Sequence, residues 1–175
     1  MRQTVRNVPI STAGRKGRRL LAQVEDGMRE AGRLWTDVVR FHAEARAAGG
    51  AWPNKGRLHE FTRGGYALHS QTVQQVYHKL LGNVEATMTR RREDPSTRRW
   101  LKLPHHDKDS YPLVWPAQAV HHDAARGRVV LPMGRGRKSL CVPAPDLTGA
   151  VLGGASICLG VGAASHVIRD YSERN

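Results

Sequence analysis

Apolar residues recur three and four positions apart throughout residues 21–45, and this spacing constrains the fold more than any other feature of the chain. The stripe consists of Leu21, Val24, Met28, Ala31, Trp35, Val38, His42 and Ala45. An α-helix has 3.6 residues per turn, so these positions fall on one face of a single long helix, which we expect Gly49 and Gly50 to end. A helix with one apolar face must bury it. We therefore expect Trp35 and Met28 to be core residues rather than the lining of a ligand pocket.

A second long helix is predicted from Ser70 onward, with Ser70 as its N-cap. Its apolar face is formed by Val73, Val76, Tyr77, Leu80, Val84 and Met88. Gln71 and Gln75 lie on the outer face, where their amides can form hydrogen bonds. A short amphipathic segment near residues 58–61 precedes this helix, and we expect the two long helices to pair. Residues 90–102 are too polar to bury and are predicted to form a basic loop.

The remainder of the chain is predicted to be rich in β-strands. Prolines exclude long helices there, at Pro104, Pro112, Pro116, Pro132, Pro143 and Pro145. Strands are expected at residues 119–122, 128–131, 139–142, 155–161 and 166–171, and a first short strand at residues 3–10. The sequence thus predicts an α+β fold in which two long helices are inserted between a short first strand and a later antiparallel, barrel-like β-rich part. The expected boundaries are 1–11 for the first strand, 12–92 for the helical insertion and 93–175 for the β-rich part.

One uncharged stretch allows a second interpretation. Residues 147–168 contain no Lys, Arg, Asp or Glu, and a run of this length can in principle cross a bilayer. However, the stretch is rich in Gly and Ser, and its apolar residues alternate as in a strand around Cys158. We therefore expect strands here and no membrane partner.

The charge balance is strongly basic. The chain has 28 Lys plus Arg against 15 Asp plus Glu, which gives a formal charge of +13. Such a field attracts polyanions, and the preference for Arg favours phosphate because a guanidinium can donate two hydrogen bonds to it. The two cysteines are too few for a disulfide framework, and no apolar leader follows Arg2 and Arg6. The expected location is the cytoplasm, in association with the nucleoid.

Two basic segments are the predicted nucleic-acid contacts. The first is the segment from Arg126 to Lys138, which contains no acidic residue and has glycines that let the backbone approach a phosphate. The second is the segment from Arg90 to Lys102, where Trp100, with Tyr111 and Trp115 further along the chain, could stack on bases or riboses. The predicted nucleic-acid-binding residues are Arg90, Arg91, Arg92, Arg98, Arg99, Lys102, Arg126, Arg128, Arg135, Arg137, Lys138, Gln71, Gln75, Trp100 and Tyr111. Solvated loops and sheet packing of the aromatic residues are the alternative explanations.

A repeated His-His-Asp motif suggests a different class of function. It occurs at residues 105–107 and again at residues 121–123. One His from each copy could share a zinc ion in a metal-dependent hydrolase, although neighbouring side chains on a strand point to opposite faces. We therefore favour surface polar strands and predict neither a metal site nor a cofactor.

Three segments resemble a known protein family. They are Tyr111-Pro-Leu-Val-Trp-Pro-Ala-Gln-Ala-Val120, Arg128-Val-Val-Leu-Pro-Met-Gly-Arg-Gly-Arg-Lys138 and Leu68-His-Ser-Gln-Thr-Val-Gln-Gln-Val76. Together they resemble the amino-terminal part of transposon-encoded TnpB (OrfB) proteins, which are related to type V CRISPR effectors. The resemblance extends over most of residues 3–145. It implies a wedge-like β-barrel interrupted by a helical recognition insertion, which holds a structured guide RNA and, as a second ligand, target DNA.

The chain also departs from that family. The Asp, Glu and Asp of a RuvC-like nuclease and the four cysteines of a zinc ribbon are missing, so no catalytic role is carried over and we predict a binding module rather than an enzyme. A nuclease half encoded separately would be a natural partner. The other interpretation is a truncated transposase fragment without function.

Overall fold

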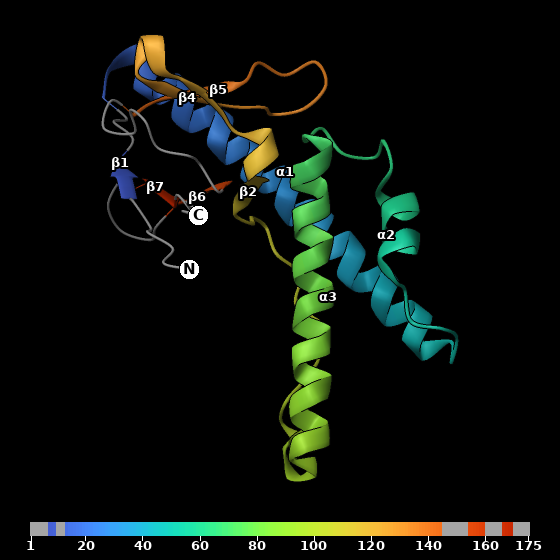
Figure 1. The fold of residues 1–175 in the computed structure, drawn as a ribbon. Helices are drawn as coiled ribbons and strands as arrows, with labels where there is room; N and C mark the ends of the chain where they lie inside the picture. The colour runs from blue at the N-terminus through green and yellow to red at the C-terminus, as the bar shows by residue number, and fades with distance from the viewer. Residues whose placement is uncertain (1–6, 10–12, 145–153, 160–165, 170–175) are drawn as a thin grey trace.

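The computed structural model describes residues 7–9, 13–144, 154–159 and 166–169. Its helices are α1 (Gly14–Ala47), α2 (Lys55–Thr62) and α3 (Ser70–Glu93), with a short 3-10 helix η1 (Pro95–Arg99) directly after α3. The strands are β1 (Asn7–Pro9), β2 (Leu113–Pro116), β3 (His121–Asp123), β4 (Arg128–Leu131), β5 (Leu140–Pro143), β6 (Gly154–Leu159) and β7 (His166–Arg169). The α+β class predicted from the sequence is confirmed, with α1 and α3 as the two long helices (Figure 1).

Helix α1 carries the predicted apolar stripe on its buried face. Val24, Met28, Ala31, Trp35, Val38 and His42 are all buried, while Leu21 and Ala45 near its ends are half-buried. The helix ends at Ala47, and Gly49 beyond it has a φ of 69°. Glycine adopts this left-handed conformation without the steric cost that a Cβ adds, which explains why the helix ends here.

Helix α3 differs from the prediction at both ends. Its N-cap is His69, and Ser70 is the first helical residue, so the prediction of Ser70 as the cap was wrong by one position. The helix also continues to Glu93, so Arg90, Arg91 and Arg92 form its last turn instead of a loop. Arginine is a good helix former, and cations are favoured at the negative end of the helix dipole, which accounts for the extra turn.

The strands form two antiparallel sheets. One has the order β1-β7-β6-β2 and the other the order β3-β4-β5. The first described strand pairs with the last one, with Asn7 opposite Arg169, and the helices lie in the chain between this first strand and the later antiparallel strands, as expected. The described part of the predicted strand at residues 3–10 is β1, and the rest lies outside the described residues. Strand β2 was not predicted, because it is a short run next to Pro112 whose partner β6 lies far along the chain.

Both sheets turn their buried side chains into the core shared with the helices. Leu113 and Trp115 of β2, Val129 of β4 and Val142 of β5 belong to the same buried cluster as Leu34 of α1. The indole Nε1 of Trp115 donates a hydrogen bond to the carbonyl of Pro132, 2.7 Å away. The sheets thus share one core, although the described strands do not pair into one continuous barrel sheet.

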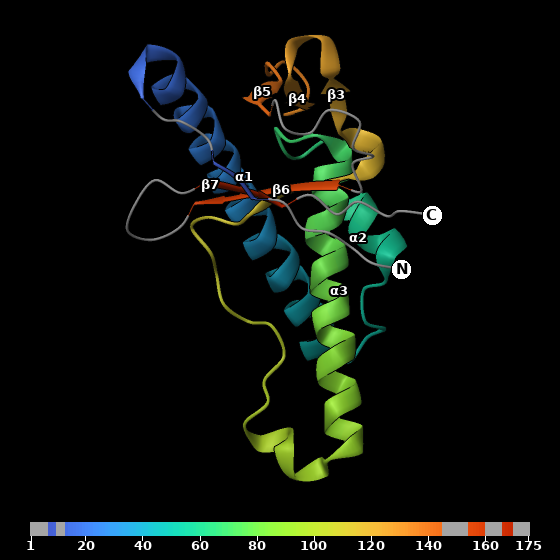
Figure 2. The ribbon, with the colours of Figure 1, turned by 60° about the vertical axis from the view of Figure 1, so that its left-hand side comes forward.

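The segment between η1 and β2 returns along α1 (Figure 2). The Trp35 indole donates to the carbonyl of His106 at 3.1 Å, and the amide of Tyr111 donates to the carbonyl of Met28 at 2.9 Å. The rings of Trp35 and Tyr111 stack with centroids 4.7 Å apart. Gly32 allows this close approach, because a Cβ there would lie 2.7 Å from the carbonyl oxygens of Lys108 and Asp109.

Part of the uncharged stretch at residues 147–168 forms β6 and the start of β7, as the alternating pattern predicted. Within the residues that the structure describes, no helix combines the length and the apolar character needed to cross a bilayer.

Candidate nucleic-acid interface

The far end of α3 is built as a compact turn. Asp94 caps η1 by accepting a hydrogen bond from the Ser96 amide at 3.0 Å. Thr97 is buried, and its carbonyl accepts hydrogen bonds from the amides of Trp100 and Leu101. Thr97 therefore anchors the turn, which lies at the end of α3 furthest from the strands (Figures 1 and 2).

The end of α3 and this turn carry the predicted contacts of the segment from Arg90 to Lys102. We define the basic end of α3 as the exposed residues Arg90, Arg92, Arg98, Arg99, Trp100 and Lys102. Trp100 is 63% exposed, more than Trp52 or Phe61, the other exposed large apolar residues of the described chain. No cation of the basic end forms an ion pair with any described residue. Arg91 differs, because its guanidinium donates to the carbonyl of Leu101 and closes the turn.

Some cations of the predicted segment from Arg126 to Lys138 form ion pairs, and others do not. Arg126 and Arg128 both contact Asp123, with N to O distances of 3.3 and 2.8 Å. These guanidinium groups, Arg128 first, lower the pKa of the Asp123 carboxyl. Asp123 lies just outside the segment. These arginines therefore have an acidic partner although the segment itself contains no acid. Two of the predicted phosphate contacts are thus already bound to a carboxylate.

The loop between β4 and β5 carries the other predicted cations. Arg135 and Lys138 are exposed and form no ion pair with a described residue. Arg137 is partly buried and contacts Asp26 of α1 at 3.0 Å. This pair ties the loop to α1, so Arg137 has a structural partner that the sequence did not reveal.

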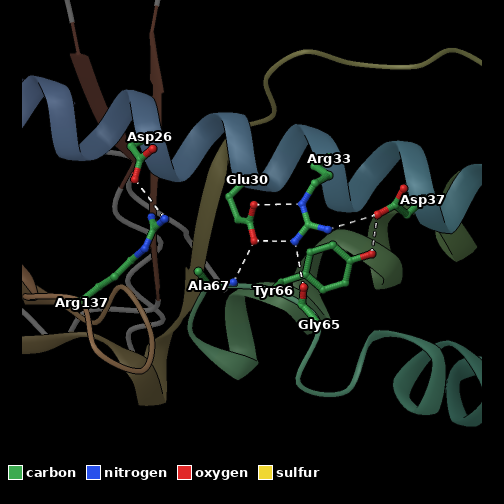
Figure 3. A network of polar contacts seen from close by, with 8 residues as sticks. All are labelled: Asp26, Glu30, Arg33, Asp37, Gly65, Tyr66, Ala67 and Arg137. Carbon is green, nitrogen blue, oxygen red and sulfur yellow. Dashed lines mark hydrogen bonds and ion pairs between the residues drawn. The ribbon is translucent and has the colours of Figure 1, made fainter.

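One face of α1 holds the chain between α2 and α3 through a network of polar contacts (Figure 3). Glu30 accepts hydrogen bonds from Arg33, 2.7 Å away, and from the amide of Ala67 at 2.8 Å. Arg33 also donates to the carbonyl of Gly65 and lies over the ring of Tyr66. Figure 3 shows Arg137 and Asp26 beside this network, so α1 supports residues 65–67 and the β4–β5 loop together.

Between these two supported segments lies a groove of about 470 Å³. One wall is the chain from Arg63 to Gln74, which includes the start of α3, and the other is the loop from Pro132 to Ser139. Arg63, Arg135 and Arg137 line it together. This volume falls in the range of roughly 300 to 1,000 Å³ that is typical of small-molecule sites. We call this feature the α3 groove.

Gly134 fixes the two walls of the α3 groove against each other. Its φ is 119°, and a Cβ there would lie 2.6 Å from the carbonyl carbon of Leu68 and 3.0 Å from the amide nitrogen of His69. Only glycine allows the backbones to come this close at that φ. The groove is therefore a built feature of the fold.

The remaining predicted contacts lie outside both features. Gln71 and Gln75 are half-buried on α3, but Gln74 is the glutamine that lines the α3 groove. Tyr111 is stacked on Trp35, and burial raises the pKa of its phenol. One face of the Tyr111 ring is thus used for packing.

The carboxylates of the two His-His-Asp motifs have arginine partners. Asp107 pairs with Arg40, and Asp123 pairs with Arg126 and Arg128. The Nδ1 atom of His105 contacts the carbonyl of Leu103 at 2.9 Å. Among the described residues, no three His, Cys, Asp or Glu side chains come together to hold a metal ion.

No protein-family model matches the chain, and no curated protein is significantly similar to it. The basic end and the α3 groove are therefore the features of the molecule that indicate a function.

Sequence reasoning missed two groups of cations. Arg63 lines the α3 groove but stands alone in the sequence, and nothing local indicates that residues 63–74 meet the β4–β5 loop. The other group lies exposed in the first turns of α1 and consists of Arg15, Lys16, Arg18 and Arg19. Cations are disfavoured at the positive end of a helix dipole, and this mismatch is a sequence pattern that could have revealed the second group.

Glu30 is expected to make the fold sensitive to acid. The hydrogen bond from Arg33, followed by that from Ala67 and the field of Arg33 and Arg137, lowers its pKa from the ordinary value of 4.5, against desolvation. A carboxylate with a lowered pKa stabilises the folded state fully above its unfolded pKa, and the contribution is lost as pH falls through the folded pKa. Glu30→Gln should therefore lower the free energy of unfolding at pH 7 by about 1 to 3 kcal/mol, since it removes charge-assisted hydrogen bonds.

Urea denaturation at neutral pH and well below pH 4.5 measures this effect. The wild type should lose more stability between the two conditions than Glu30→Gln does. Glu85→Gln is the control, because Glu85 is exposed on α3 and forms no ion pair with a described residue. Equal acid sensitivity of wild type and Glu30→Gln would show that the network contributes nothing to the pH dependence.

Proposed function

We propose that the protein is a nucleic-acid-binding module whose principal contact surface is the basic end of α3, with structured RNA as its main ligand and DNA as a second one. The observation that carries this proposal is that five exposed cations without described acidic partners share a short segment with the exposed indole of Trp100. Nucleic acid combines a phosphate chain with flat bases. A basic surface beside a free aromatic ring offers a partner for each of them.

The contrast with several other exposed arginines supports this choice. Arg29, Arg33, Arg40 and Arg126 are each paired with a carboxylate, so their charges are largely compensated. Asp94, beside the basic end, accepts hydrogen bonds from Ser96. It forms no ion pair with the described arginines of the basic end. Uncompensated guanidinium groups at the tip of a projecting helix are accessible to a long polyanion.

The resemblance to TnpB-type proteins is part of the same proposal. It favours a folded guide-like RNA over an unstructured strand, and a separately encoded nuclease as a further partner. The distinguishing expectation is that a structured RNA binds more tightly than an unstructured RNA of equal length and charge.

A quadruple variant, R90A/R92A/R98A/R99A, tests the basic end. Its affinity for RNA at low ionic strength should fall by about tenfold or more, because each phosphate contact releases counterions. The slope of log affinity against log salt should flatten by roughly 2 to 3, at about 0.7 per lost contact on a single strand. Fluorescence anisotropy across a salt series measures both quantities. Trp100→Ala should weaken binding with little change in slope, since base stacking is nearly salt-independent.

The matched control removes the same number of charges elsewhere, in R15A/K16A/R18A/R19A at the start of α1. All eight side chains in these two variants are exposed, so neither is expected to unfold the chain. An equal loss of affinity in both variants would mean that net charge, and not the basic end, attracts the RNA. A wild-type protein that binds neither RNA nor DNA at low salt would refute the proposed function itself.

A further inference from the structure

The α3 groove lies at the opposite end of α3 from the basic end. Helix α3 is 24 residues and about 36 Å long at 1.5 Å per residue, and the stretch from Gln74, which lines the groove, to Arg90 of the basic end covers about 24 Å of its axis. A single nucleotide cannot contact both. The groove therefore requires an explanation of its own.

The groove has a cationic side. Arg63 and Arg135 are exposed, line it, and form no ion pair with a described residue, while Arg137 is held beside them by Asp26. The first turn of α3 also faces the groove through Ser70, contains no acid, and receives no side-chain cap from His69. Its amides are thus available, and this end of the helix dipole favours an anion.

The groove also has an apolar side. Leu68, Val73, Pro132 and Met133 line it, and Leu68, Val73 and Met133 belong to the buried core. His69 also lines the groove, and its Nδ1 atom is buried without a hydrogen-bond partner among the described residues. The two sides of the groove therefore fit a ligand that joins a compact anion to a mostly apolar body.

We infer that the α3 groove binds one nucleoside monophosphate unit, with the phosphate between Arg63 and Arg135 and the base against Leu68, Val73 and Met133. A free nucleotide and the phosphorylated end of a strand share this chemistry. The choice of a nucleotide over another aromatic anion rests on the proposed function. The groove is a second site, because none of its lining residues belongs to the basic end.

Four probes test the inference on the whole protein: AMP, inorganic phosphate, and one short RNA prepared with either a 5′-phosphate or a 5′-hydroxyl. AMP should bind more tightly than inorganic phosphate, because only AMP uses the apolar side. In R63A/R135A the affinity for AMP should fall by about tenfold or more, since charge-assisted hydrogen bonds to phosphate are lost. K16A/R19A, which loses the same charge from exposed positions on α1, should bind AMP as the wild type does.

The RNA pair distinguishes the two sources of the ligand. A gain in affinity from the 5′-phosphate that disappears in R63A/R135A would assign the groove to a strand end, whereas AMP binding without that gain would assign it to a free nucleotide. Failure to bind AMP together with equal affinity for the two RNAs would overturn the inference, as would AMP binding that R63A/R135A leaves unchanged. Binding of the 5′-hydroxyl RNA depends on the basic end, so its failure alone would count against the proposed function. Thermal unfolding of each variant confirms that it is folded.

Discussion

Gly32→Ala should destabilise the protein by about 3 kcal/mol and lower its Tm by roughly 6 to 12 °C. In an open helix position the same change would stabilise by up to about 1 kcal/mol, because alanine is the better helix former. Here the new Cβ would lie 2.7 Å from the backbone of Lys108 and Asp109. Backbone cannot rotate aside as a flexible side chain does, so the returning segment has to leave α1.

The loss of stability in Gly32→Ala has a second source besides the steric clash of the new Cβ. The returning segment is held by the hydrogen bond from Trp35 to His106, by that from the Lys108 amide to Thr36 at 3.0 Å, and by the stacking of Tyr111. Displacing it weakens all three contacts. Calorimetry measures the change in Tm, and near-ultraviolet circular dichroism reports the loss of the stacked Trp and Tyr rings.

Gly82→Ala is the matched control for Gly32→Ala. Gly82 is an exposed residue of α3, and a Cβ there would meet nothing within 4 Å. It should raise the free energy of unfolding by about 0.5 to 1 kcal/mol, opposite in sign to Gly32→Ala. If both substitutions stabilised the protein, the returning segment would not pack against α1 as described.

Gly134→Ala should cost about 4 kcal/mol and disrupt the α3 groove. Two effects add. At a φ of 119° a residue with a Cβ is strained, and this Cβ would also lie 2.6 Å from the backbone of Leu68. The β4–β5 loop then has to move away from the start of α3, which separates Arg135 and Arg137 from Arg63. Chemical denaturation measures the stability, and AMP binding reports the state of the groove.

Gly136→Ala separates the two effects. Gly136 lies in the same loop with a φ of 76°, but a Cβ there would meet nothing within 4 Å. It should therefore cost only about 1 to 2 kcal/mol of backbone strain and leave the groove intact. If Gly134→Ala cost no more than Gly136→Ala, the contact with Leu68 would not hold the walls together.

The sequence predicted the helices and their buried faces well, because those depend on local spacing. The stripe from Val24 to His42 is buried as expected, and strand β4 has the predicted bounds of 128–131. Charge also indicated which segments carry exposed cations. These properties are encoded within a few turns of helix or a few residues of strand.

The partners of the charges could not be predicted, because they depend on contacts between distant segments. Arg137 meets Asp26 across more than half of the chain, and Arg63 lines the same groove as the β4–β5 loop, which is about 70 residues further along the chain. Asp123 lies near Arg126 in the sequence, but its pairing requires the turn geometry of the β3–β4 hairpin. The sequence therefore identified candidate cations but could not show which of them are paired with an acid.

Cations lie near both ends of α3, in the α3 groove and at the basic end, so the length of this helix determines how far apart they are. About 36 Å matches one full turn of a B-form duplex, which is roughly 34 to 36 Å. A double helix laid parallel to α3 would therefore present the same side of its backbone at the first turn of α3 and again at its last turn. If α3 were longer or shorter by half a turn of such a duplex, one end of the helix would face a groove of the duplex instead of its backbone, and the match would be lost.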